Sequence, residues 1–125
     1  MSAFFELRMY KVFSGKMDEW IKFMEGTIIP FQVSKGMVIH GSFIVDRRNE
    51  YSLKDGERQM DTVDDNQTYV WIRRFSSETS KEKLYKEVYE SNEWINNILP
   101  IVNQLIDRNS IVVNNLNSTD LSTMK

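Results

Sequence analysis

The feature that most constrains this chain is a strand-then-helix unit that occurs twice. Residues 4–12 alternate between two sets of side chains, as the two faces of a strand do. Residues 16–29 then repeat apolar side chains at helical spacing. The same order returns with a predicted strand at 67–75 and a predicted helix at 77–90. The duplication predicts a small domain in which two such units share one sheet.

Two further strands complete the pattern, at 37–47 and 109–116. The polar stretch 48–66 is predicted to be a long exposed connection, with a hairpin extension as one form it could take. Pro30 is expected to end or kink the first helix, because proline cannot donate the helical hydrogen bond. Pro100 suits the first turn of a last helical segment.

The resulting order, β-α-β-β-α-β, predicts an α+β domain of the ferredoxin-like type, with a four-stranded antiparallel sheet and helices on one face. We expect one domain over residues 1–116 and a flexible C-terminal tail at 117–125.

The helices can cover only one face of such a sheet. Alternation predicts that the Leu, Ile, Val and Met side chains of the first and third strands face the helices. The opposite face would then carry Arg8, Tyr10, His40, Tyr69, Trp71, Arg73 and Phe75. Such a face is too aromatic to stay open to water and too charged for an ordinary core. We therefore expect a homodimer in which two sheets pack face to face around a semi-polar interior.

Composition excludes several classes of function. The net charge of -2 argues against a nucleic-acid partner, which requires a strongly basic surface. No apolar run approaches the ~20 residues that span a bilayer, and the N-terminus has no signal-peptide pattern, so we expect a cytoplasmic protein. The chain has no cysteine and one histidine, and we expect neither a metal nor a cofactor.

Several short motifs resemble the NIPSNAP family. Glu6-Leu7-Arg8-Met9-Tyr10, followed by Ser14-Gly15-Lys16 and a helix, resembles the opening of that family. Tyr69-Val70-Trp71 and the later Ser91-Asn92-Glu93-Trp94 before Pro100 resemble its second half. Together the motifs cover residues 4 to 116.

The resemblance implies a dimeric α+β barrel. The wider superfamily includes cofactor-independent monooxygenases and haem-degrading enzymes, whereas the NIPSNAP branch has no agreed reaction, so the fold does not give the function. In the monooxygenases an aromatic substrate lies between sheet and helices. By that analogy Trp20, Phe43 and Tyr85 are rival pocket residues.

Five residues are the candidates for a ligand pocket: Arg8, Tyr10, His40, Trp71 and Arg73. His40 is the best candidate for a catalytic residue, as a general base or an iron ligand near the two arginines, because its side chain titrates near neutrality. The alternative is a hydrogen-bonded interface histidine. Arg8 and Arg73 could bind an anionic group, or they could be neutralised by Glu6 across the strands.

The sequence leaves two classes of function open. The first is a barrel that binds a small molecule, including a monooxygenase-like enzyme. The second is a non-catalytic, stress-related dimeric module. A ligand-binding protein requires an open cavity of ligand size, whereas a purely structural module predicts a filled interior whose titratable groups pair with one another.

Overall fold

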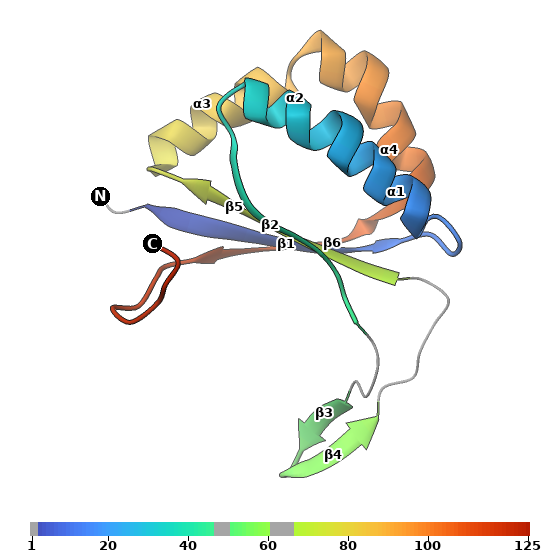
Figure 1. Cartoon of the computed structure of the whole chain (residues 1–125), viewed down its shortest axis with the longest axis vertical. Helices are drawn as coiled ribbons and strands as arrows, with labels where there is room; N and C mark the ends of the chain where they lie inside the picture. The colour runs from blue at the N-terminus through green and yellow to red at the C-terminus, as the bar shows by residue number, and fades with distance from the viewer. Residues whose placement is uncertain (1–2, 47–50, 61–66) are drawn as a thin grey trace.

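The computed structural model describes residues 3–46, 51–60 and 67–125. Its main sheet is antiparallel, with strands in the order β2-β5-β1-β6 and the helices on one face (Figure 1). The four strands are β1 (Phe4–Val12), β2 (Val38–Ile44), β5 (Gln67–Phe75) and β6 (Ile106–Leu116). This is the predicted ferredoxin-like arrangement. The predicted bounds of β1 and β5 agree with the structure residue for residue.

Each half of the chain contains a helical segment that widens into a π-helical turn ahead of a proline. The first half has α1 (Met17–Phe23), η1 (Met24–Ile28) and α2 (Ile29–Ser34). The second half has α3 (Glu78–Tyr89), η2 (Glu93–Ile98) and α4 (Leu99–Leu105).

The prolines of these segments begin new helical turns. The first helical segment does not end at Pro30, because this residue lies in the first turn of α2, where its missing N–H is tolerated. Pro100 occupies the corresponding place in α4, as predicted. Ser77 caps α3 as expected, since its hydroxyl accepts a hydrogen bond from the Ser80 amide at 3.0 Å.

A separate hairpin lies within the predicted polar connection. Strands β3 (Tyr51–Lys54) and β4 (Glu57–Met60) pair across Asp55-Gly56, both of which have positive φ, as a tight hairpin turn requires. This confirms a hairpin extension for residues 51–60. The remaining parts of the predicted 48–66 connection, residues 48–50 and 61–66, lie outside the described residues.

The predicted orientation of the sheet is wrong, because the helices cover the aromatic and charged face. Trp71 and Tyr10 pack with Trp20 of α1, and Phe75 packs with Val88 of α3. The alternation along β1 and β5 was assigned correctly, but which face turns inward was not. Both faces are hydrophobic enough to pack, so the period of two could not decide between them.

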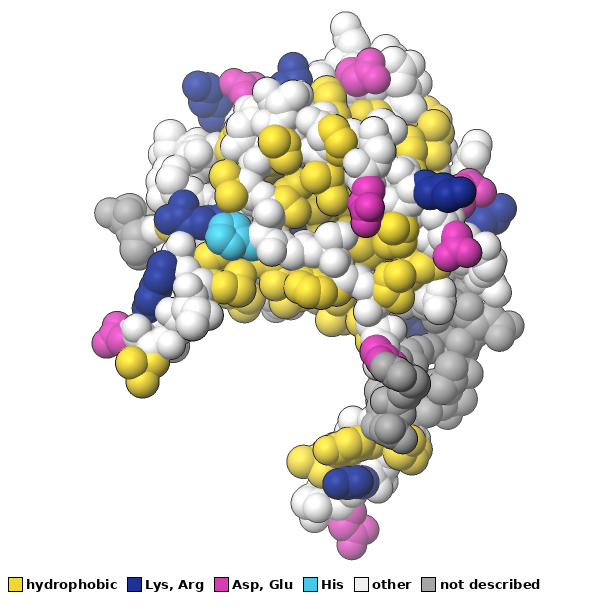
Figure 2. All heavy atoms as spheres, in the orientation of Figure 1, with side chains coloured by type: hydrophobic (Ala, Val, Ile, Leu, Met, Phe, Trp, Pro, Cys, Tyr) yellow, Lys and Arg dark blue, Asp and Glu magenta, His cyan; other side chains and the backbone are white. Residues whose placement is uncertain are grey.

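The outer face of the sheet is apolar. Phe43, Val70, Met9 and Val112 are paired across all four strands and form one continuous row, and Leu7 pairs with Ile72 beside it. Phe43, Met9 and Val112 are 40 % to 53 % exposed. The space-filling view shows hydrophobic side chains along the side of the sheet away from the helices (Figure 2).

The C-terminal residues fold back against this outer face. Ser118 and Met124 lie beside Phe5 and Ile72, and the Lys125 carbonyl accepts a hydrogen bond from Arg74 at 2.7 Å. The polar sequence did not predict these contacts, because they depend on partners far away in the chain. Whether the tail is flexible stays a prediction.

Within the described residues, no helix has the length and apolar character needed to cross a membrane.

Candidate functional site

A buried ion pair joins the two central strands. Glu6 and Arg73 lie directly opposite each other in the β1–β5 register, and the guanidinium donates to the carboxylate at 2.5 Å. Both side chains are fully buried. This confirms the predicted neutralisation of Arg73 by Glu6. Buried charges require partners, and here polar side chains accept from both terminal nitrogens of Arg73, whereas its Nε has no partner among the described residues.

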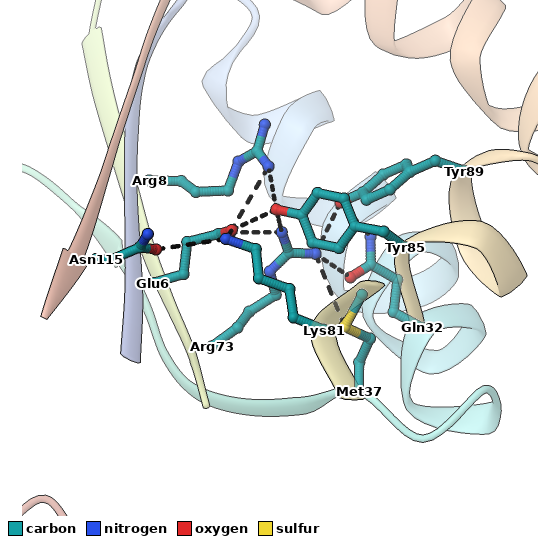
Figure 3. Close-up of polar contacts among 9 residues, drawn as sticks. All are labelled: Glu6, Arg8, Gln32, Met37, Arg73, Lys81, Tyr85, Tyr89 and Asn115. Carbon is teal, nitrogen blue, oxygen red and sulfur yellow. Dashed lines mark hydrogen bonds and ion pairs between the residues drawn. The ribbon is translucent and has the colours of Figure 1, made fainter. Parts of the chain in front are cut away.

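Hydroxyls and an amide from the helices complete the cluster around Arg73 (Figure 3). Arg73 donates to Tyr89 at 2.7 Å, to Gln32 at 2.9 Å and to Tyr85 at 3.0 Å. The Tyr85 hydroxyl in turn donates to the second Glu6 oxygen. Residues from β1, β5, α2 and α3 are thereby fixed to one another, and Tyr85 and Tyr89 are held in place from the sheet side.

Two more cations approach Glu6. Lys81 lies 2.9 Å and Arg8 lies 3.6 Å from its carboxylate oxygens. Burial alone would raise the pKa of Glu6, but the charge of Arg73 and the hydrogen bonds from Tyr85, Arg73 and Lys81 outweigh it and lower the pKa to about 2. Glu6 is therefore ionised at neutral pH, and the cluster of Glu6, Arg8, Arg73 and Lys81 carries two more positive than negative charges.

A cavity of about 420 Å³ lies between the sheet and the helices, beside this cluster. Its volume falls in the range that binds small organic molecules. The side chains that line it are mostly aromatic or aliphatic. They are Arg8, Tyr10, Trp20, Met24, Ile28, Trp71, Tyr85, Tyr89, Trp94, Leu99, Val102, Ile106, Arg108 and Ile111. All three tryptophans of the chain are among them.

The cavity walls contain buried donors without acceptors. The indole N–H groups of Trp20 and Trp71 and the Nε of Arg8 have no hydrogen-bond partner among the described residues. Trp20 and Trp71 are only 1 % and 4 % exposed. Such orphaned donors are rare in native interiors and call for a bound partner such as water or ligand.

The structure brings together three of the five predicted pocket residues. Arg8, Tyr10 and Trp71 line the cavity, whereas Arg73 lies in the buried cluster that supports it. Of the rival residues suggested by analogy, Trp20 and Tyr85 also line the cavity. Phe43 does not, because its ring lies on the outer face of the sheet.

The placement of His40 near Arg8 and Arg73 is wrong. The register of β2 against β5 shifts between Ile39 and Gly41, which places a β-bulge at His40. The exposed imidazole packs edge-on against the ring of Phe5, with centroids 5.1 Å apart, on the face away from the cavity. His40 therefore has no contact with the cavity and no geometry for a general base there.

The sequence analysis missed Tyr89, Trp94 and Gln32 as residues of the site. The helical spacing of Tyr85 and Tyr89 was visible, because residues four apart share one helix face. Nothing local marked the buried position of Gln32, which follows from packing between α2 and β5.

Comparison with known proteins adds information on the fold. No protein-family model matches the chain. No curated protein matches it either.

Solved structures do match over nearly the whole chain. One is a NIPSNAP family protein with unknown function from Agrobacterium tumefaciens, with a TM-score of 0.76 at 18% identity, covering 99% of this chain and 95% of that one. A second NIPSNAP family protein from the same organism has a TM-score of 0.69 at 20% identity, with coverages of 97% and 90%.

An uncharacterised NIPSNAP-like domain protein from Burkholderia xenovorans is also similar. Its TM-score is 0.73 at 14% identity, and the match covers 96% of this chain and 88% of that one. At these identities the similarity concerns the fold alone. The chain therefore has a NIPSNAP-like α+β fold, as its sequence motifs predict.

Proposed function

We propose that this protein binds a small organic molecule in the cavity between its sheet and its helices, and that it does so as a homodimer. The observation that carries the binding proposal is the cavity itself, which is of ligand size and is walled by side chains with unpartnered N–H donors. A purely structural module would fill this space with side chains.

An apolar body suits the cavity walls. Tyr10, Trp20, Trp71 and Trp94 offer aromatic surfaces, and Ile28, Val102 and Ile111 offer aliphatic ones. Aromatic side chains contribute large contact areas to binding at low entropic cost.

The dimer is proposed from the outer face of the sheet. A row of apolar side chains crosses all four strands, and three of its members are 40 % to 53 % exposed, as at an interaction surface. A second copy of the same face is its natural cover, because isologous packing pairs an apolar sheet with itself. Two such sheets would bury on the order of 1,600 Å², the size of a stable interface. Its interior would be apolar, in contrast to the semi-polar interior that the sequence predicts.

Monooxygenase-like chemistry finds no base in the described cavity. Its lining contains no histidine and no carboxylate, and burial raises the pKa of Tyr10 well above its usual value. Binding, rather than catalysis through His40, is the function that the arrangement favours.

Native mass spectrometry of protein purified without added ligand tests the proposal. The expected result is a dimer that carries a reproducible extra mass. The Ile111→Phe variant, which places a larger side chain in the cavity wall, should keep the dimer and lose that mass. A monomer would refute the dimer proposal. A ligand that remains bound to the Ile111→Phe variant at full occupancy would place binding elsewhere.

A further inference from the structure

We infer that the ligand of this cavity is an organic carboxylate, with its anionic head at Arg8 and its apolar body between the tryptophans. The inference rests on the proposed function, because it specifies the chemical class of the molecule bound there. Three features of the cavity support it.

The first feature is the kind of polar atom left without a partner. Three buried polar atoms of the cavity-lining residues have no hydrogen-bond partner among the described residues, and each of them is a donor: Arg8 Nε, Trp20 Nε1 and Trp71 Nε1. Buried donors without acceptors are costly, and their complement is a group that only accepts hydrogen bonds. An ionised carboxylate is such a group, whereas an amine or ammonium ion would add further donors.

The second feature is charge. Two side chains of the cavity lining are cationic, Arg8 within it and Arg108 on the exposed part of β6, and none is anionic. Glu6, the nearby carboxylate, already has Arg73 and Lys81 as partners within 3 Å. An incoming anion is therefore attracted by the excess positive charge around Arg8. Glu6 does not neutralise that excess, because its carboxylate is already paired with Arg73 and Lys81.

The third feature is the way in which Arg8 is held. One terminal nitrogen of its guanidinium donates to the Tyr85 hydroxyl at 3.2 Å and lies 3.6 Å from Glu6. The other terminal nitrogen points away from both groups (Figure 3). The cluster thus fixes Arg8 through one terminal nitrogen and leaves the other terminal nitrogen, which points away from the cluster (Figure 3), as the guanidinium donor for an anion in the cavity.

The test compares two probes of nearly equal shape, 4-phenylbutanoate and its neutral amide, 4-phenylbutanamide. Binding is read from tryptophan emission, because all three tryptophans line the cavity and the phenyl group does not absorb where indole is excited. The acid should bind about tenfold to a hundredfold more tightly than the amide, as a charge-assisted hydrogen bond implies.

Two arginine variants locate the effect. In Arg8→Gln the preference for the acid should disappear, because the affinity for the acid falls to that for the amide, and the remaining binding of the amide shows that the cavity is intact. Arg74→Gln is the matched control, since Arg74 lies on the neighbouring strand β5 with its side chain on the opposite face. This variant should keep the full preference for the acid.

The outcomes separate the inference from the proposed function. If the acid and the amide bind the wild type equally, or if Arg8→Gln keeps the preference, the carboxylate inference is wrong while small-molecule binding stands. If neither probe alters tryptophan emission even at millimolar concentration, and no copurified mass is found, the proposed function fails together with the inference.

Discussion

Glu6 and Arg73 form a fully buried ion pair between the two central strands, with 2.5 Å between Oε1 and Nη2. The pair ties β1 to β5, and through Tyr85, Tyr89 and Gln32 it ties the sheet to α3 and α2. It lies behind the cavity and not inside it. Its role is to position the aromatic wall and Arg8.

The first prediction concerns pH. The pKa of Glu6 is lowered from 4.5 to about 2, so its ionised form stabilises the fold above pH 4.5, and this contribution is lost as the pH falls toward 2. The contribution amounts to roughly 3 kcal/mol. In urea titrations at a series of pH values, the unfolding free energy of the wild type should fall as the pH is lowered from 4.5 toward 2. The Glu6→Gln variant should have a lower unfolding free energy at neutral pH, and this free energy should decrease less over the same pH range.

The matched control for that series is Glu87→Gln, which changes an exposed glutamate of α3. It removes the same charge from the chain without touching the cluster. If the unfolding free energies of the two variants depend on pH in the same way, Glu6 has no special role in stability at acidic pH.

The second prediction concerns the coupling of the ion pair. Glu6→Leu should destabilise the protein by about 3–5 kcal/mol, because it leaves Arg73 as an uncompensated buried charge. Arg73→Met should cost less, because Lys81 and Arg8 still lie near the Glu6 carboxylate. The double variant should lose clearly less than the sum of the two, since neither charge of the pair remains. Unfolding free energies from urea titration measure this cycle, and strict additivity would contradict a direct interaction.

The third prediction concerns the end of α2. Gly36 has a φ of +106°, and a Cβ there would lie 3.3 Å from the Leu84 side chain. Gly36→Ala should therefore cost about 1 kcal/mol or more. Gly26→Ala is the control, because that glycine is helical with open space around it and should become neutral or up to about 1 kcal/mol more stable. Equal melting temperatures for the two variants would refute the assignment of strain.

The fourth prediction tests the proposed dimer face. Met9→Glu places a charge in the central apolar row of the sheet, and dimer affinity should fall roughly a hundredfold or more, because a buried charge without a partner is costly. Ile95→Glu changes an apolar residue on η2, among the helices, that is 48 % exposed against 40 % for Met9, and it should leave the dimer intact. Light scattering across a dilution series measures both, and a wild-type dimer that withstands Met9→Glu would have to use another surface.

The fifth prediction concerns His40. Because its ring contacts Phe5 on the outer face, His40→Ala should leave the binding of 4-phenylbutanoate unchanged within twofold. The measurement is the tryptophan titration used for the arginine variants. A large loss of affinity in His40→Ala, with an unchanged dimer, would mean that this side chain reaches the cavity after all.

The sequence alone determined the four strands of the main sheet, the two helical segments and their order. The alternation in β1 and β5 and the cap at Ser77 are local signals, because a strand or a helix imposes its period on neighbouring residues. The pairing of Glu6 with Arg73 was also within reach as one of two alternatives, since antiparallel neighbours bring opposite charges together. The NIPSNAP-like fold followed from the motifs and their spacing.

Only the tertiary structure decided which face of the sheet turns toward the helices. Alternation along a strand predicts which residues share a face, but it does not predict which of the two faces the helices cover. In this structure the face with Glu6, Arg73 and the aromatic side chains lies inward. Its charges can be buried only because Tyr85, Tyr89 and Gln32 arrive from distant segments to pair with them. The bulge that turns His40 outward and the cavity lined by three tryptophans depend on the same long-range packing, which no local pattern encodes.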